Sequence, residues 1–345
     1  MLTSMAPLFR SRGVNCDIVA LMERPSPLTR ILEESKINFL YTGVRTLYSP
    51  LQIGALAKSL DGYDIAHVHL FPAQLWAVLA TAWLGNRTPL VTTEHNTWNA
   101  RRRWWLWPLD QWMYTHYQRI VCNSAATAQY LVEWCPDTTE NISVIHNGIS
   151  LRAFETARPA ALPGVLPGVT RLVFVGRCEP QKDHATLLRA LPAIRDAHLI
   201  LVGDGPLRPR LEQMAHSLGI KERVSFLGWR DDVASILKAS DIYVHPTHSD
   251  GFGIAACEAM AAGLPVVASD VPGLAQIVEG AAVLFPPGDH LRLTRELTEL
   301  IALPARQRKM SEASVRRARQ FSIEHTVDEY VRVYESVLER QAKFV

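Results

Sequence analysis

The stretch DIYVHPTHSDGFGIAACEAMAAGLPVVASD, residues 241–270, contains two short apolar runs separated by a glycine-containing loop and an alanine-rich segment. The runs at 241–246 and 265–270 have the length and β-branched content of buried strands, and the segment 253–263 is typical of a closely packed helix. Parallel strands require this order, because helices join them and cover both faces of their sheet. The stretch therefore predicts one strand–helix–strand unit of an α/β domain.

Similar runs alternate with helical patterns through the whole chain. They occupy residues 16–21, 38–41, 64–70, 89–95, 119–124 and 142–147 in the first half, and 171–176, 198–203, 223–228, 241–246, 265–270 and 281–285 in the second. This alternation predicts an α/β, doubly wound fold. We expect two Rossmann-like domains that face each other across a cleft, with the ligand in that cleft.

Residues 155–170 divide the two halves, because three Pro and two Gly interrupt any periodic element there. We predict an N-terminal domain over 1–154, a linker over 155–170 and a C-terminal domain over 171–320. The segment 321–345 carries an apolar helical stripe: Val327, Tyr330, Val331, Tyr334, Val337 and Leu338. This helix either caps its own domain or crosses back to the first, and we expect the second.

The beginning of the chain is unusual for an α/β domain. Residues 2–12 are predicted to form a helix that stops at Gly13 and is followed by a strand. Such a domain normally begins with a strand and a tight loop before its first helix, and both are missing. We expect either that the native start lies upstream or that the protein is impaired, and we favour the first.

Composition excludes several classes. The 345 residues carry a formal net charge of +2, which does not indicate nucleic-acid binding. Five scattered Cys without C-x-x-C spacing argue against a disulfide framework or a zinc site and favour a reducing compartment. The longest apolar run, residues 75–84, is too short to span a bilayer, and we identify no signal peptide. We therefore expect a cytoplasmic protein.

Two cations follow the strand at 171–176. Gly176, Arg177 and Lys182 lie where the carboxyl end of a parallel strand meets ligand in such folds. Arg offers a planar fork for phosphate oxygens and Lys a compact charge, so the pair could hold a diphosphate. The alternative is two solvated loop charges.

Two acids flank the glycine turn of the opening stretch. Gly251 and Gly253 allow backbone N–H groups near the helix start to point at a ligand. Asp250 and Glu258 could accept hydrogen bonds from the hydroxyls of a sugar and of a ribose. The alternative is a helix-capping Asp and a Glu in an internal ion pair.

Together these segments resemble the retaining glycosyltransferases of family four, which have the GT-B architecture. The resemblance covers nearly the whole chain. In order, it rests on VCNSAATAQYL, VIHNGIS, VGRCEPQKDHATLLRAL, LVGDGPLRPRLE, VSFLGWRDDV, SDIYVHPTHSDGFGIAACEAMAAGLPVVAS and FSIEHTVDEYVRVYE. The second-half segments carry most of its specificity.

The resemblance implies a role for each matching residue. Arg177 and Lys182 would clamp the donor diphosphate, Glu258 would bind the ribose and Asp250 the donor sugar. His95, which alone is more typical of a structural histidine, would face that sugar. The remaining donor-binding positions would be Gly176, Gly228, Trp229, Arg230 and Asp231, with Gly228–Asp231 beside the base, and the backbone N–H groups of Phe252, Gly253, Ile254 and Ala255.

Two departures from the family pattern stand out. The first acid of its motif is usually Glu, whereas this chain has the shorter Asp250. The missing first strand would also remove a glycine-rich loop, which in the family approaches the donor phosphate and the acceptor.

The predicted function is retaining transfer of a sugar from a nucleotide-diphosphate sugar to a saccharide or glycolipid hydroxyl, in polysaccharide or glycolipid synthesis. No metal or other cofactor is expected, because side chains supply the cations. The alternatives are a non-catalytic scaffold or regulatory subunit and a nucleotide-sugar epimerase. The base, sugar, acceptor, linkage and oligomeric state are not predicted.

The segment NARRRWWLWPLDQWMY, residues 99–114, bears on the acceptor. It combines three arginines, Arg101, Arg102 and Arg103, with four tryptophans, Trp104, Trp105, Trp107 and Trp112. Arg interleaved with Trp suits the surface of an anionic membrane, so residues 101–112 could place the enzyme on the inner face of a membrane beside a lipid-linked acceptor. The alternative, which we favour slightly, is a helix with core tryptophans and solvated arginines.

Overall fold

The computed structural model describes residues 2–23, 37–85, 88–97, 99, 101–162 and 164–342. The chain divides into two compact units. Unit 1 comprises Met1–Gly148 and Ile323–Val345, and unit 2 comprises Ile149–Ser322. Each unit has its own parallel sheets and its own buried core.

Unit 2 contains a six-stranded, all-parallel sheet. Its order is β12 (Ala282–Phe285), β11 (Val266–Ser269), β10 (Ile242–His245), β7 (Thr170–Val175), β8 (Ala197–Val202) and β9 (Val224–Gly228). The strand order reverses between β7 and β10. In doubly wound folds, ligands bind outside the carboxyl ends of the strands at such a point. The loops after β7 and β10 therefore meet where a ligand site is expected.

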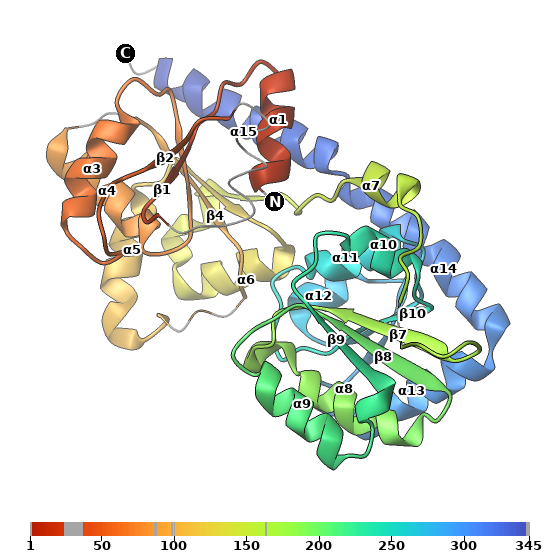
Figure 1. Cartoon of the computed structure of the whole chain (residues 1–345). Coiled ribbons are helices and arrows are strands. Elements are labelled where there is room, and N and C mark those ends of the chain that lie inside the picture. The colour runs from red at the N-terminus through yellow and green to blue at the C-terminus, as the bar shows by residue number, and fades with distance from the viewer. Residues whose placement is uncertain are drawn as a thin grey trace. The chain divides into compact units, whose positions relative to one another are not determined.

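Helices cover both faces of this sheet (Figure 1). On one face α8 (His184–Ala190) contacts both α9 (Arg208–Ser217) and α13 (His290–Ala302). On the other, α11 (Ile254–Ala261) contacts α7 (Leu151–Thr156) and α14 (Pro304–Ala318), with α10 (Val233–Lys238) and α12 (Pro272–Ile277) nearby. Because both faces are covered, β8, β10 and β11 are buried along their whole length.

The predicted linker at 155–170 lies inside unit 2, which corrects the expectation that it separates the domains. The chain passes from unit 1 to unit 2 at Gly148–Ile149 and returns at Ser322–Ile323. Ala160 and Leu162 pack against the core of unit 2, and the Ala160 N–H donates to the carbonyl of Ser235 at 2.9 Å. The prolines interrupt regular structure, but apolar residues between them still pack against the core of unit 2.

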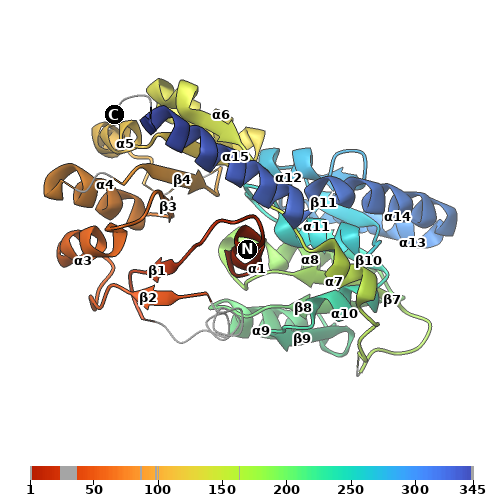
Figure 2. The ribbon, with the colours of Figure 1, turned by 90° about the horizontal axis from the view of Figure 1, so that it is seen from above.

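Unit 1 contains two parallel sheets among its described residues. One pairs β1 (Ile18–Ala20) with β2 (Phe39–Tyr41), and the other has the order β3 (Ala66–His69), β4 (Leu90–Glu94), β5 (Arg119–Cys122) and β6 (Ile142–Val144). This unit also contains the helices α3 (Leu51–Leu60), α4 (Ala73–Leu84), α5 (Trp107–Thr115) and α6 (Ala125–Trp134). Figure 2 shows α3, α4 and α5 in a row, and each contacts the next.

The final helix α15 (Ile323–Ala342) belongs to unit 1 and packs against α1 (Leu2–Ser11). The two helices and the sheet share one core: Met5, Phe9, Val91, Val121, Ile145, Ile323, Val327, Tyr330 and Val337. The apolar stripe therefore covers the N-terminal sheet, while Leu338 at its end is 38% exposed. Gly148 lies so close to the backbone of Ile323 that no side chain fits there.

Candidate active site

A partly buried ion pair joins the loops that follow β7 and β10. Lys182 ends the short 3-10 turn Pro180–Lys182, and its Nζ lies 2.5 Å from Oδ2 of Asp250. The side chains are only 22% and 13% exposed. The ammonium has three donors, so two remain for a ligand after the bond to Asp250.

Asp250 also has three protein donors besides Lys182. Its Oδ2 lies 3.1 Å from Nε2 of His245, and its Oδ1 accepts from the backbone N–H of Gly253 at 2.9 Å and of Phe252 at 3.3 Å. Burial by itself raises the pKa of Asp250, but these hydrogen bonds and the charge of Lys182 outweigh it and hold the pKa well below its usual value. The carboxylate is therefore ionised and anchors the loop.

The tautomer of His245 follows from its neighbours. An ionised Asp250 can only accept, so Nε2 of His245 carries the proton, and Nδ1 accepts from the hydroxyl of Tyr243 at 3.0 Å. Burial lowers the pKa of His245 although Asp250 opposes this effect, so the ring is neutral. Tyr243 and His245 project from the same face of β10 because they are two residues apart.

These contacts correct part of the predicted site. The N–H groups of Phe252 and Gly253 were expected to face a ligand, but here they donate to Asp250, which was expected to bind sugar hydroxyls. The reason is local: Gly253 has a φ of 81°, and this turn brings the backbone to the short Asp side chain. Among the described residues the N–H groups of Ile254 and Ala255, at the start of α11, have no acceptor. They remain available to an anion.

Arg177 lies apart from the Lys182–Asp250 pair. Its Nη1 lies 2.8 Å from Oε1 of Glu179, and its side chain is 74% exposed. Of the four side chains expected to converge, Lys182 and Asp250 are in direct contact. Arg177 and Glu258 make no hydrogen bond or ion pair with them in the part of the chain that the structure describes.

Glu258 lies on α11 and is half-buried. Its carboxylate has no hydrogen-bond donor and no cation among the described residues. Burial therefore raises its pKa to about 7. A half-buried acceptor without a partner is the feature expected of a residue that a ligand completes.

The turn after β9 places an exposed aromatic ring at the same edge of the sheet. Gly228 has a φ of 67°, and its carbonyl accepts from the N–H of Gly203 at 2.8 Å. Trp229 is 59% exposed, whereas Arg230 is held by two hydrogen bonds to Asp232, at 2.6 and 2.7 Å. The exposed indole can stack on a planar ligand group, while Arg230 is already paired. Asp231 is exposed and Gly176 donates to the carbonyl of Val202.

In unit 1, His95 follows β4 and contacts a second histidine. Nε2 of His95 lies 3.1 Å from Nδ1 of His69, the last residue of β3. The backbone carbonyl of His95 accepts from Nδ2 of Asn123 at 2.9 Å. Burial lowers the pKa of His95 to about 4, so the ring is neutral.

The sequence analysis missed His69, Tyr243 and His245. All three lie in strands where polar and apolar residues alternate, AHVH and IYVH, and both histidines end their strands. A polar residue repeated at every second position of such a strand, as in AHVH and IYVH, was the available signal.

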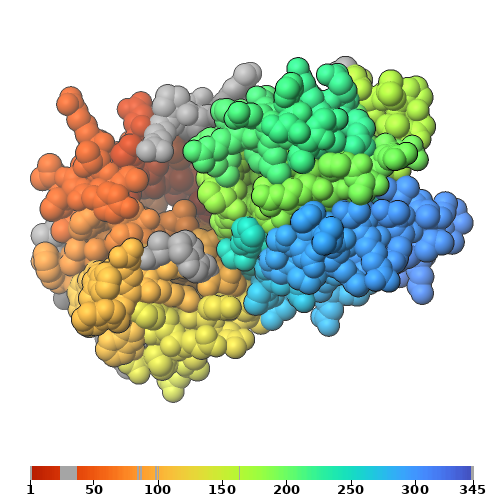
Figure 3. All heavy atoms as spheres, turned by 90° about the horizontal axis from the view of Figure 1, so that it is seen from below, coloured from red at the N-terminus to blue at the C-terminus, as the bar shows by residue number. Residues whose placement is uncertain are grey.

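The arginine- and tryptophan-rich segment separates into two parts. Arg101 is inside the fold, 3.1 Å from Asp110 and above the ring of Phe71, and Trp112 packs into the core beside α4. Three tryptophans, Trp104, Trp105 and Trp107, are 80%, 53% and 44% exposed. Arg103 is also exposed and lies over the Trp105 ring. Figure 3 shows this part of unit 1, in gold, on the surface.

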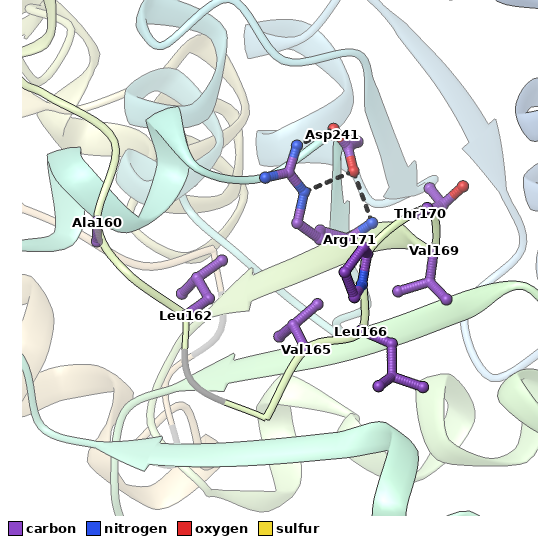
Figure 4. A pocket seen from close by; sticks show the side chains of 10 residues that line it. Ala160, Leu162, Val165, Leu166, Val169, Thr170, Arg171 and Asp241 are labelled. Carbon is purple, nitrogen blue, oxygen red and sulfur yellow. Dashed lines mark hydrogen bonds and ion pairs between the residues drawn. The ribbon is translucent and has the colours of Figure 1, made fainter.

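A cavity of unit 2 with a volume of about 580 Å³ lies elsewhere. It is lined by Ala160, Leu162, residues 165–171 and Asp241, at the amino ends of β7 and β10. Figure 4 shows the Arg171–Asp241 pair among the lining residues, with the guanidinium hydrogen-bonded to the carboxylate. Because ligands of doubly wound sheets bind at the carboxyl ends, we do not assign the active site to this cavity.

The residues that the structure describes contain neither a metal-binding cluster nor a membrane-spanning helix. In those ranges no three His, Cys, Asp or Glu side chains are grouped so that they could bind a metal ion. Nor does any helix in the same ranges combine the length and hydropathy needed to cross a bilayer.

Comparison with known proteins is consistent with this geometry. Residues 1–153 match the family described as Glycosyltransferase Family 4, and residues 169–302 match Glycosyl transferases group 1. The D-inositol 3-phosphate glycosyltransferase of Mycolicibacterium gilvum is 34% identical over 292 residues, which cover 77% of this chain and 64% of that protein. The enzyme of the same name from Nocardia farcinica is 31% identical over 82% of this chain and 68% of its own length. The chain thus spans about two thirds of these relatives.

Solved structures show the fold class. Anabaena HepE in complex with UDP-glucose superposes with a TM-score of 0.84 at 20% identity, covering 97% of this chain and 94% of that one. A glycosyltransferase from Rickettsia africae gives 0.81 at 19% identity over 97% and 93%. The fold is α/β with the two Rossmann-like domains of GT-B glycosyltransferases. This chain belongs to glycosyltransferase family 4.

Proposed function

We propose that the chain is a retaining glycosyltransferase that transfers a sugar from a nucleotide-diphosphate sugar to a hydroxyl of a saccharide or glycolipid acceptor. Membership of the family supports transfer, and the complex of Anabaena HepE with UDP-glucose supports a UDP-sugar as the first donor to test. The observation that carries the proposal is the group of unsatisfied ligand-binding atoms at the strand ends of unit 2. Lys182, Glu258 and the start of α11 contribute to it.

Each of these groups has a role in binding the donor. The ammonium of Lys182, kept in place by Asp250, and the guanidinium of Arg177 neutralise the diphosphate as it leaves. The N–H groups of Ile254 and Ala255 donate to a phosphate oxygen, which the positive end of α11 favours. Glu258 accepts from the ribose hydroxyls, and Trp229 stacks on the base.

The reaction then depends on transition-state charge. Cations already in place interact more strongly with the developing charge of the leaving group than with the ground state, which is worth about 3–4 kcal/mol for one donor. The acceptor hydroxyl attacks from the face that the leaving group vacates, so the anomeric configuration is retained. Side chains supply the positive charge that neutralises the diphosphate, and we therefore propose metal-independent transfer.

Donor screening and one lysine variant test this function. Thermal shifts with UDP-, GDP- and ADP-sugars should identify a donor, because ligand at about 100 times its Kd stabilises the folded state by about 2.7 kcal/mol. Lys182→Ala should lower transfer by about 100-fold or more. Lys221→Ala, an exposed lysine before β9, is the control and should transfer normally. Undiminished turnover in Lys182→Ala contradicts the diphosphate role.

Two alternatives give other results in the same assays. A non-catalytic scaffold or regulatory subunit binds nucleotide without turnover, and an epimerase interconverts the free nucleotide sugars without an acceptor. The unpartnered Glu258 and the partly free Lys182 favour a functional donor site, so the transferase remains the preferred proposal.

We further propose that the acceptor is presented at an anionic membrane surface on the cytoplasmic side, in polysaccharide or glycolipid synthesis. Trp104, Trp105 and Arg103 support this, because exposed indoles beside a cation suit the headgroup region. Vesicles containing phosphatidylglycerol should bind the protein, and Trp104→Ala with Trp105→Ala should weaken binding about tenfold. Leu291→Ala, a 72% exposed residue of unit 2, is the control. Equal binding to neutral vesicles contradicts the proposal.

A further inference from the structure

Two histidine rings of unit 1 share one hydrogen bond at the carboxyl edge of its four-stranded sheet. His69 ends β3 and His95 follows β4, and the parallel register places His69 opposite Thr93. Thr93 and His95 lie two residues apart, so their side chains share a face of the sheet with His69. The rings therefore meet edge to edge, with Nδ1 of His69 3.1 Å from Nε2 of His95.

The number of ring protons limits which hydrogen bonds the two histidines can offer to a ligand. Burial lowers the pKa of both rings, to about 4 for His95, so both are neutral at pH 7. A neutral imidazole has one N–H and one lone pair. The shared bond uses one N–H and one lone pair. The outward nitrogens, Nδ1 of His95 and Nε2 of His69, must then offer one donor and one acceptor between them. Neither has a partner among the described residues.

The third histidine of this face has no free nitrogen. Nδ1 of His67 lies 2.6 Å from the hydroxyl of Tyr334, and Nε2 lies 2.7 Å from Oγ1 of Thr93, which in turn lies 3.1 Å from the hydroxyl of Tyr330. The His67 ring packs on His69 with centroids 4.3 Å apart. The His67 ring is thus held by hydrogen bonds at both nitrogens, and its packing keeps the His69 ring in position.

The charged side chain of this part of the sheet lies on the opposite face. Glu94 is bonded to Gln74 at 2.6 Å and to the hydroxyl of Tyr114 at 2.7 Å, both from helices α4 and α5. Among the described residues, the rings of His67, His69 and His95 make no hydrogen bond to a carboxylate. In the part of the chain that the structure describes, the bond to His69 is thus the contact that can fix which nitrogen of His95 carries the proton.

We propose that His69 is a positioning residue, which sets the tautomer of His95 and thereby the polarity of the nitrogen that His95 offers to a substrate hydroxyl. This inference rests on the proposed function, in which His95 contacts a sugar. The paired outward donor and acceptor match a neutral polyhydroxylated ligand, because each hydroxyl both donates and accepts. His69 acts through His95.

Two variants of nearly the same shape test this role. In His69→Asn the side-chain amide lies as many bonds from Cα as Nδ1 does, so it can still donate to or accept from His95. His69→Leu fills similar space without a polar atom. We expect kcat/KM for transfer to fall about tenfold or more in His69→Leu and less than about threefold in His69→Asn, since a lost hydrogen bond of about 1.4 kcal/mol is a factor of ten. Equal losses in both variants contradict the positioning role.

A measurement on the free protein separates this role from packing. With ¹⁵N-labelled histidine, the two ring-nitrogen shifts of His95, assigned with a His95→Gln sample, report its tautomer. These shifts should change in His69→Leu and stay close to wild type in His69→Asn. Unchanged shifts in His69→Leu overturn the inference. Because this readout needs no substrate, a wild-type chain that transfers no sugar contradicts the proposed function separately.

Discussion

Replacement of Glu258 by Gln should make the ligand-free protein more stable at alkaline pH. Among the described residues the half-buried carboxylate has no donor, and burial raises its pKa from 4.5 to about 7. An acid whose pKa is raised on folding stabilises the native state relatively more when it is protonated. Its contribution is therefore lost as the pH rises from the unfolded pKa through the folded one. Gln has the shape of the protonated acid and does not titrate, so it escapes this loss.

The magnitude follows from the two pKa values. Ionisation of Glu258 costs the folded state about 0.8 kcal/mol at about pH 5 and about 3.4 kcal/mol at about pH 8. The stability difference between Glu258→Gln and wild type should therefore grow by about 2.5 kcal/mol in favour of the variant over this range. Urea unfolding of both proteins at the two pH values measures the difference. Glu222→Gln, an exposed site in the same unit, controls for the loss of one charge.

A stability difference that changes by less than about 0.5 kcal/mol between these pH values refutes the reasoning. It would mean that Glu258 has a donor or water contacts that keep its pKa ordinary. The same carboxylate gives a second readout in donor binding. If the ionised form accepts from ribose, wild-type affinity for the nucleotide sugar should rise between about pH 6 and about pH 8, and Glu258→Gln should bind weakly at both.

Three further outcomes are expected. Asp250→Asn should destabilise the protein by about 1–3 kcal/mol near neutral pH, because Lys182 loses its charged partner. The stability difference between variant and wild type should disappear as the pH falls below 3.8 toward the depressed pKa of Asp250, and a difference in urea unfolding that does not change with pH contradicts this. Gly148→Ala should lower the free energy of unfolding by about 2 kcal/mol or more, because the added Cβ would overlap the Ile323 backbone. Gly54→Ala, in open space on α3, should raise it by about 0.5–1 kcal/mol, so equal melting temperatures for the two variants contradict this. Arg177→Met should leave the melting temperature within about 1 °C of wild type while it lowers transfer, because the side chain is 74% exposed; a large drop in stability would show an unrecognised contact.

Much of the fold could be predicted because its signals are local. Twelve apolar runs were expected to be strands, and each overlaps a strand of the structure. The stripe on α15 identified its buried side, since the 3.6-residue period shows which residues face a core. The linker prediction failed because Pro and Gly report where regular structure stops, not which core the intervening residues cover.

The candidate site was predictable in position and less so in contacts. Strand ends and the glycine turn pointed to Lys182, Asp250 and Glu258, because the carboxyl edge of a parallel sheet is where such residues gather. His95 was expected to face a ligand only because of the family resemblance. Their partners were not visible. Lys182 and Asp250 are 68 positions apart, and His69 and His95 are 26 apart.

The sequence by itself determined the order of strands and helices, the glycine turn at 251–253 and the edge of each sheet that carries polar residues. Only the tertiary structure decided that Asp250 is bound by protein donors, that Glu258 has none within the described ranges and that His69 contacts His95. The physical reason is that a hydrogen bond needs two atoms about 3 Å apart. Strand register and helix packing set such distances between remote segments, and periodicity along one segment does not.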